Sequence, residues 1–183
     1  AMLGLYEQRF DFGKSDFFVH LGDIASSIDN FDDQVLYGFT DHFNRNGMIQ
    51  PLCVVQGNHE YSGRDCAKWL SAFSASGTGT CRAFRYGNTF FVVLEYWDSQ
   101  TAESKEMEEW AVKALHSEES RSATFRVVMN HAPSFLPDSP PTAVAALLER
   151  LGKSAKIHLC LSGHSHRYCR TNPEAVSYLA RPE

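Results

Sequence analysis

Residues 52–60 read LCVVQGNHE, an apolar run followed directly by a polar turn. The run Leu52–Val55 is short and continuously apolar, which is typical of a strand buried on both faces of a parallel sheet. Gly57 lets the backbone turn sharply, so that the side chains after it can come close to a bound group. The segment predicts an α/β fold whose sheet carries functional side chains at the carboxyl ends of its strands.

The same unit of an apolar run and a polar turn occurs three more times. The further units are FFVHLGD at 17–23, FRVVMNH at 125–131 and IHLCLSGHSH at 157–166. Because the carboxyl ends of parallel strands share one edge of a sheet, we expect the polar side chains of all four turns to converge. Carboxylate, amide oxygen and imidazole donors suit Mn, Fe or Zn better than an ion that prefers thiolates. The predicted metal ligands are Asp23, Asn58, His131, His164 and His166.

The segments between these units predict helices and one hairpin. Amphipathic patterns predict helices near 31–47, 65–73, 101–116 and 142–151. The turn Gly87-Asn88 joins two strand-like runs at 82–86 and 89–96, which adds an antiparallel pair. A last strand-like run lies at 175–179. We expect one domain over residues 1–183, with helices layered on mixed sheets.

The composition excludes several classes of protein. Of the 183 residues, 43% are hydrophobic and 21% are charged, with a net charge of −5, which excludes wholesale disorder and argues against nucleic-acid binding. No apolar run approaches the roughly 18 residues of a membrane span, and no signal-peptide pattern is visible. That missing pattern and the odd number of cysteines, five, favour the cytoplasm. A Cys66–Cys81 disulfide stays the alternative for a secreted protein.

The ordered motifs resemble those of the calcineurin-like metallophosphoesterases. That family has GD, GNH[ED], a lone His after a strand and GHxH, and the resemblance spans residues 16–170 of this chain. The His-x-Tyr-x-Arg pattern at 166–170 resembles the purple acid phosphatase branch, although Cys169 stands where that branch usually has Glu. The branch also has a metal-binding Tyr three residues after the GD aspartate. Ser26 stands there in this chain, which argues against tyrosinate–iron(III) chemistry.

The resemblance implies a layered α/β/β/α sandwich and a role for each metal ligand. Asp23 would bridge two metals. Asn58, His131 and His164 would complete the shell of the second metal, and His166 would belong to the first. The metals implied are divalent or trivalent Mn, Fe or Zn, two for the family, with one complete site in this chain.

The resemblance also implies the reaction and the residues around the metals. A metal-bound hydroxide would hydrolyse a phosphate ester, with His59 as general acid or as a hydrogen-bond donor to the phosphoryl oxygens. Glu60 would orient a metal ligand or His59. Tyr168 and Arg170 would contact the substrate. That substrate would be a phosphorylated small molecule or a phosphoprotein, with no distinction between monoester and diester.

One motif of the family has no full counterpart. The family's first metal takes an Asp from an N-terminal D-x-H or D-x-G motif, and Asp11-Phe12-Gly13 matches the latter. Only 12 positions separate Asp11 from Asp23, fewer than a crossover helix and a strand need. We therefore expect the chain to lack the first β-α unit, with its second sheet incomplete at the C-terminal end. Two functions stay open: a metal-dependent phosphoesterase, or a non-catalytic phosphoesterase-like binding or scaffold module.

Overall fold

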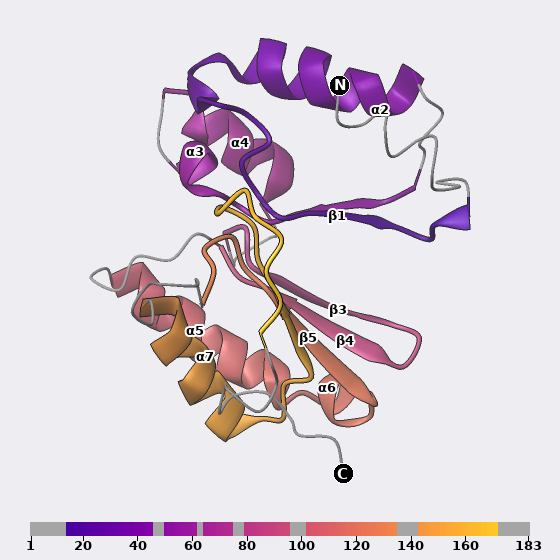
Figure 1. Cartoon of the computed structure of the whole chain (residues 1–183), viewed down its shortest axis with the longest axis vertical. Coiled ribbons are helices and arrows are strands. Elements are labelled where there is room, and N and C mark those ends of the chain that lie inside the picture. The colour runs from indigo at the N-terminus through magenta and orange to yellow at the C-terminus, as the bar shows by residue number, and fades with distance from the viewer. Residues whose placement is uncertain are drawn as a thin grey trace.

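Two sheets lie face to face between two layers of helices in the computed structural model (Figure 1). The structure describes residues 14–45, 50–61, 64–74, 79–95, 102–134 and 143–171. The first sheet pairs β1 (Phe18–His20) with β2 (Leu52–Val54) in parallel. The second sheet has the order β3-β4-β5-β6. Its strands are β3 (Arg82–Tyr86), β4 (Thr89–Val93), β5 (Phe125–Met129) and β6 (Leu159–Leu161).

The second sheet is mixed, as the sequence predicts. Strands β3 and β4 form the antiparallel hairpin, with Tyr86 opposite Thr89 across the turn. Strands β4, β5 and β6 run parallel to one another, so that their carboxyl ends lie at one edge of the sheet. Among the described residues, β6 is an edge strand, because only β5 pairs with it.

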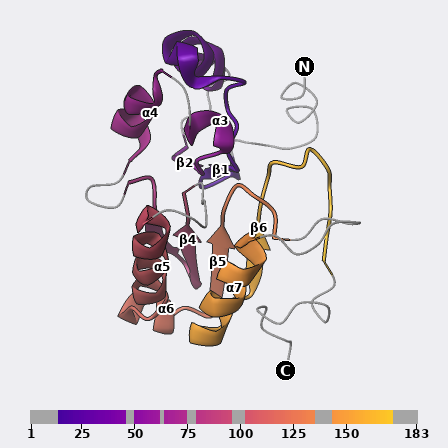
Figure 2. The same cartoon turned by 90° about the vertical axis from the view of Figure 1, so that its left-hand side faces the viewer.

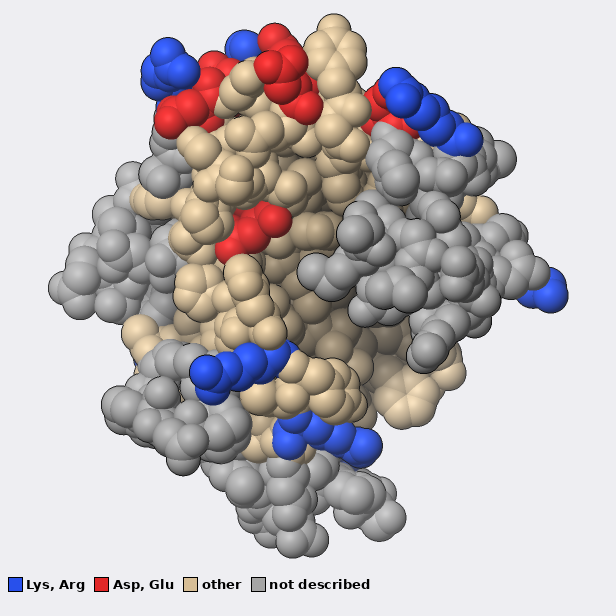
Figure 3. All heavy atoms as spheres, turned by 45° about the horizontal axis from the view of Figure 1, so that its top comes forward, with Lys and Arg blue, Asp and Glu red and all other residues tan. Residues whose placement is uncertain are grey.

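One helical layer covers the first sheet. It packs Trp69, Phe31 and Val35 against Val54 of β2. Acidic and basic side chains mix over this layer, at the top of Figure 3, and Lys68 and Asp32 form an ion pair there at 3.2 Å. The elements of this layer are η2 (Ile28–Asn30), η3 (Asp32–Thr40), α2 (Asp41–Arg45), α3 (Asn58–Tyr61) and α4 (Cys66–Phe73).

The other helical layer covers the outer face of the second sheet (Figure 2). It consists of α5 (Ala102–Leu115), α6 (Glu118–Arg121) and α7 (Ala143–Ser154). Leu147, Leu148 and Leu151 on one face of α7 are buried in this core, because apolar residues three and four apart share one face of a helix. The Arg150 guanidinium joins α7 to α5 through both carboxylate oxygens of Glu108, at 2.6 and 2.8 Å.

A third core lies between the two sheets, and strand alternation explains it. Side chains of successive strand residues point to opposite faces of a sheet. Val127 and Met129 of β5 therefore face the first sheet, while Val128 between them faces the helices. Cys53 of β2 packs against Val127 and Met129 in the same central core, while Val54 packs with the first helical layer. Burial on both faces explains why these strands are continuously apolar.

The four-layer fold is confirmed, with differences in detail. The predicted helix at 31–47 is largely a π-helix, η3, in which Asp41 N–H donates to the carbonyl of Leu36. The predicted strand at 157–161 forms as β6 over its last three residues only. Asp11 and the predicted strand at 175–179 lie outside the described residues.

Two further observations concern the cysteines and the helices. All five cysteines are free, so the alternative Cys66–Cys81 disulfide is absent from the structure. Among the described residues, no helix combines the length and the apolar character that a membrane span needs.

Candidate metal centre

Four predicted ligands converge from the ends of four different strands. Nε2 of His131, after β5, lies 3.0 Å from Oδ2 of Asp23, after β1. The same nitrogen lies 3.1 Å from Oδ1 of Asn58 and 3.1 Å from Nδ1 of His164. The Asn58 oxygen and the His164 nitrogen are 2.9 Å apart. Neighbouring ligands of an octahedral ion with bonds of about 2.1 Å are about 3.0 Å apart, so these separations fit a metal ion.

The protons of His131 strengthen this argument. Its Nδ1 lies 2.7 Å from the backbone carbonyl of Leu21, which can only accept, so Nδ1 carries the proton. In the neutral ring Nε2 then presents a lone pair to the carboxylate oxygen of Asp23 and the amide oxygen of Asn58, which also carry lone pairs, and a proton on Nδ1 of His164 would satisfy only one of its own contacts with His131 and Asn58. One proton on Nε2 could satisfy only one of these three contacts. The His131 ring is 1% exposed, so water cannot relieve the repulsion, and a cation between the four donors would do so.

The backbone is strained at this group. Within the described residues, the only non-glycine residues with positive φ are Asp23 at 55°, His164 at 67° and His166 at 51°. The left-handed conformation costs a non-glycine residue roughly 1–2 kcal/mol. Strain of this kind persists where the surrounding structure enforces it, and it concentrates at functional sites. All three strained residues belong to the predicted ligand set.

The buried side chain of Glu60 connects the two loops that carry the predicted ligands Asp23 and Asn58. Its carboxylate is fully buried, and Oε2 accepts the backbone N–H of Asp23 and of Gly57, both at 2.8 Å. Oε1 accepts the N–H of Ala25 at 3.3 Å. A Cβ at position 57 would lie 2.5 Å from the Asp23 nitrogen and 2.7 Å from Oε2 of Glu60, so the close approach requires glycine. The carboxylate thus holds the Asp23 loop against the turn that carries Asn58.

His59 borders the four donors without joining them. Its side chain is 46% exposed, and its Nε2 lies 4.0 Å from Oδ2 of Asp23. The backbone N–H of His59 donates to Oδ1 of the same carboxylate at 3.2 Å. The imidazole is therefore open to a ligand on the solvent side of Asp23.

His166 is not part of the converging group. Among the described His, Cys, Asp and Glu residues, the group that could hold a metal consists of Asp23, His131 and His164. His166 is exposed, and its assignment to a first metal stays a prediction. Loss of solvent lowers the pKa of His164, with His131 and, more weakly, His166 adding to the effect. A lowered pKa favours the neutral ring that a metal requires.

The sequence patterns did not identify two groups that lie near this site, the Leu21 carbonyl and the His20 side chain. The Leu21 carbonyl orients His131, and no side-chain pattern could reveal it because the acceptor is backbone. His20, one residue earlier on β1, packs edge-on against Phe39 with ring centroids 5.3 Å apart. Its Nδ1 is buried without a hydrogen-bond partner in the described structure. The sequence signal that could have identified His20 is its position two residues before Gly22, where the predicted turn begins.

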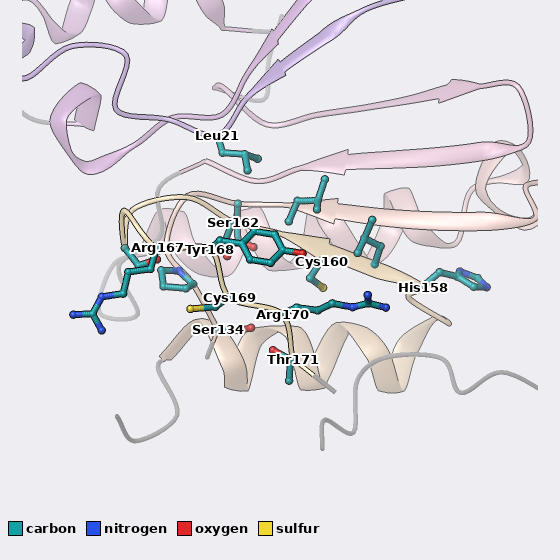
Figure 4. Close-up of a pocket in the computed structure, with 15 residues that line it drawn as sticks. Leu21, Ser134, His158, Cys160, Ser162, Arg167, Tyr168, Cys169, Arg170 and Thr171 are labelled. Carbon is teal, nitrogen blue, oxygen red and sulfur yellow. The ribbon is translucent and has the colours of Figure 1, made fainter. Parts of the chain in front are cut away.

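The residues after His166 return along β6 and line a cavity of about 630 Å³ (Figure 4). Tyr168 is 93% exposed, and Arg170 is exposed beside it. The lining of the cavity includes Ser165, which lies between the predicted ligands His164 and His166 in the chain. Tyr168 and Arg170 thus line a cavity together with Ser165, outside the ligand set, and their contact with a substrate stays a prediction.

Comparisons with known proteins identify the family and the fold. The family model described as calcineurin-like phosphoesterase matches residues 3–168. The solved structure of purple acid phosphatase PPD1, isolated from yellow lupin (Lupinus luteus) seeds, matches with a TM-score of 0.55 and 16% sequence identity. The match covers 85% of this chain and 31% of the lupin chain, so it shows a shared fold over part of that protein. No curated protein sequence matches significantly.

Proposed function

Because the chain belongs to the calcineurin-like phosphoesterase family, we propose that it hydrolyses phosphate esters at a transition-metal centre. The observation that carries this proposal is the convergence of Asp23, Asn58, His131 and His164 with their donor atoms about 3 Å apart. This mixed set of nitrogen and oxygen donors favours Mn, Fe or Zn. The family itself supports a phosphorylated molecule as substrate, and the likeness to a purple acid phosphatase supports the fold.

The described residues would each have a defined task. Asp23, Asn58, His131 and His164 would hold the ion, which supplies positive charge opposite the phosphoryl oxygens and increases the acidity of water. The Leu21 carbonyl fixes the tautomer and the orientation of His131, so that Nε2 stays free to bind.

His59 would act on the leaving group. Its exposed Nε2 lies beside the Asp23 carboxylate, where it would donate a proton to the departing oxygen or a hydrogen bond to a phosphoryl oxygen. This role requires no bond between His59 and the metal.

Metal content and hydrolysis should be measured on the same preparation. We expect elemental mass spectrometry of protein purified without chelator to find about one Mn, Fe or Zn per chain, and this protein to hydrolyse 4-nitrophenyl phosphate. His131→Ala should lose both the metal and the activity. The control, His116→Gln, changes an exposed histidine at the end of α5 that contacts Ser154 at 2.7 Å and is outside the group of donors. Metal without hydrolysis would contradict the proposal and favour a binding or scaffold module.

A further inference from the structure

A cavity runs along β6, on the side where no other described strand pairs with it, and three of its lining residues, Leu21, Asn130 and Ser165, are near neighbours in sequence of predicted metal ligands. Ser165 lies at one end, and His158, directly before β6, lies at the other. At about 3.3 Å per residue, the backbone from His158 to Ser162 spans about 13 Å along β6. The cavity volume of about 630 Å³ lies in the range of small-molecule sites, roughly 300–1,000 Å³.

The lining of this cavity is cationic in a chain of net charge −5. The residues that line it include Arg167, Arg170 and His158, together with hydroxyl groups such as Ser134 and Thr171, and include no Asp or Glu. Figure 4 shows the Arg170 side chain lying along β6 toward His158, whereas Arg167 points away from the other residues. Arg170 is therefore the cation that faces along the cavity.

Among the described residues, no side chain or backbone group pairs with the guanidinium of Arg170. Seven other arginines of the described residues each donate to a carboxylate, a carbonyl or a hydroxyl. In the same part of the chain, only Arg167 and Arg170 lack a hydrogen bond or an ion pair. Guanidinium groups bind phosphate or carboxylate oxygens through two parallel N–H groups, and such a ligand would supply the missing acceptors.

We propose that the substrate is a small phosphate ester with a second anionic group, a phosphate or a carboxylate, which Arg170 binds in this cavity. The inference rests on the proposed function, because the first phosphate would lie at the metal centre, beside Ser165. The body of the substrate then extends along β6, with the exposed Tyr168 ring over the strand (Figure 4). The separation of Arg170 from the metal ligands makes the enzyme selective for elongated molecules with an anion at each end.

The test compares two ligands that cannot be hydrolysed, hexylphosphonate and hexane-1,6-diyl bisphosphonate. Their dissociation constants are measured by calorimetry on the protein as purified, on Arg170→Gln and on Arg45→Gln. Arg45 is an exposed arginine on α2 that pairs with Asp41, and it serves as the matched control. Thermal melting of each variant checks that it is folded.

We expect the bisphosphonate to bind at least about tenfold more tightly than the monophosphonate. Arg170→Gln should reduce this ratio to about two, the factor expected for two equivalent ends, and Arg45→Gln should keep it. Equal affinities in the unchanged protein, or a ratio that survives Arg170→Gln, would overturn the proposal. Binding requires no turnover, so a retained ratio without hydrolysis of 4-nitrophenyl phosphate would overturn the proposed function and leave the anion site standing.

Discussion

The buried carboxylate of Glu60 accepts the backbone N–H of Asp23 at 2.8 Å, across 37 positions of sequence. The same oxygen accepts the N–H of Gly57, so one atom fixes the two loops that carry Asp23 and Asn58. Groups behind metal ligands commonly set the geometry of a site without touching the ion. We therefore expect Glu60 to act as a positioning residue for the two loops.

Glu60→Gln should weaken both the fold and metal binding. When the amide oxygen replaces Oε2, the NH₂ group faces the N–H of Ala25, so two donors oppose each other. We expect a loss of about 2–4 kcal/mol in the free energy of unfolding and a loss of about 10–100-fold in metal affinity. Urea denaturation and metal titration measure the two effects. Glu109→Gln, at an exposed position of α5, is the control, and equal behaviour of the two variants would exclude the positioning role.

His59→Ala should separate metal binding from turnover. Since Nε2 of His59 lies 4.0 Å from the Asp23 carboxylate and outside the group of donors, the metal content should stay unchanged. Turnover should fall about 10²–10⁴-fold. A general acid contributes most to catalysis when the leaving group is poor. His59→Ala should therefore lose more activity toward an alkyl phosphate than toward 4-nitrophenyl phosphate. Loss of the metal would instead identify His59 as a ligand.

Gly22→Ala should cost more stability than Gly87→Ala. Both glycines have positive φ, 91° and 57°, so alanine is strained at either position. A Cβ at position 22 would also collide with Nδ1 of His131 and lie 2.9 Å from the Gly57 nitrogen, whereas a Cβ at position 87 meets nothing within 4 Å. We expect Gly22→Ala to lower the free energy of unfolding by about 2 kcal/mol more than Gly87→Ala. Similar losses in chemical denaturation would show that strain alone determines the cost.

Stability should fall in mild acid, and His20 should cause part of the fall. Burial is the main cause of the lowered pKa of His20, and nearby His131 lowers the pKa further, while Asp23 acts in the opposite direction. As pH falls through the ordinary value of 6.5, the unfolded chain takes up a proton that folded His20 still resists, so unfolding becomes more favourable. The destabilisation from His20 is absent above that pH and increases as the pH falls toward the lower pKa of His20 in the folded state.

His20→Leu tests this expectation. Urea denaturation at pH 7.5 and pH 5.0 should show a smaller loss of stability on acidification in the variant than in the unchanged protein. The two proteins differ only at position 20, so the difference between their losses isolates His20. An identical loss in both proteins would contradict the assignment.

Local sequence patterns predicted most of the elements. The apolar runs at 52–55 and 125–129 form β2 and β5, because residues buried on both faces must be apolar at every position. The Gly87-Asn88 turn joins β3 and β4 as expected. The π-helical form of η3 was not predicted, because π-helices are rare and no known spacing of side chains signals one.

The sequence by itself determined which residue types end each strand, and so the donor set Asp23, Asn58, His131 and His164. Strand and turn patterns act over a few residues, which a sequence displays directly. Only the tertiary structure decided that these donors meet while His166 stays outside them, and that the Arg170 guanidinium lies along β6 with no partner among the described residues. Those outcomes depend on how two sheets pack face to face, and contacts between distant segments leave no periodic signal in the chain.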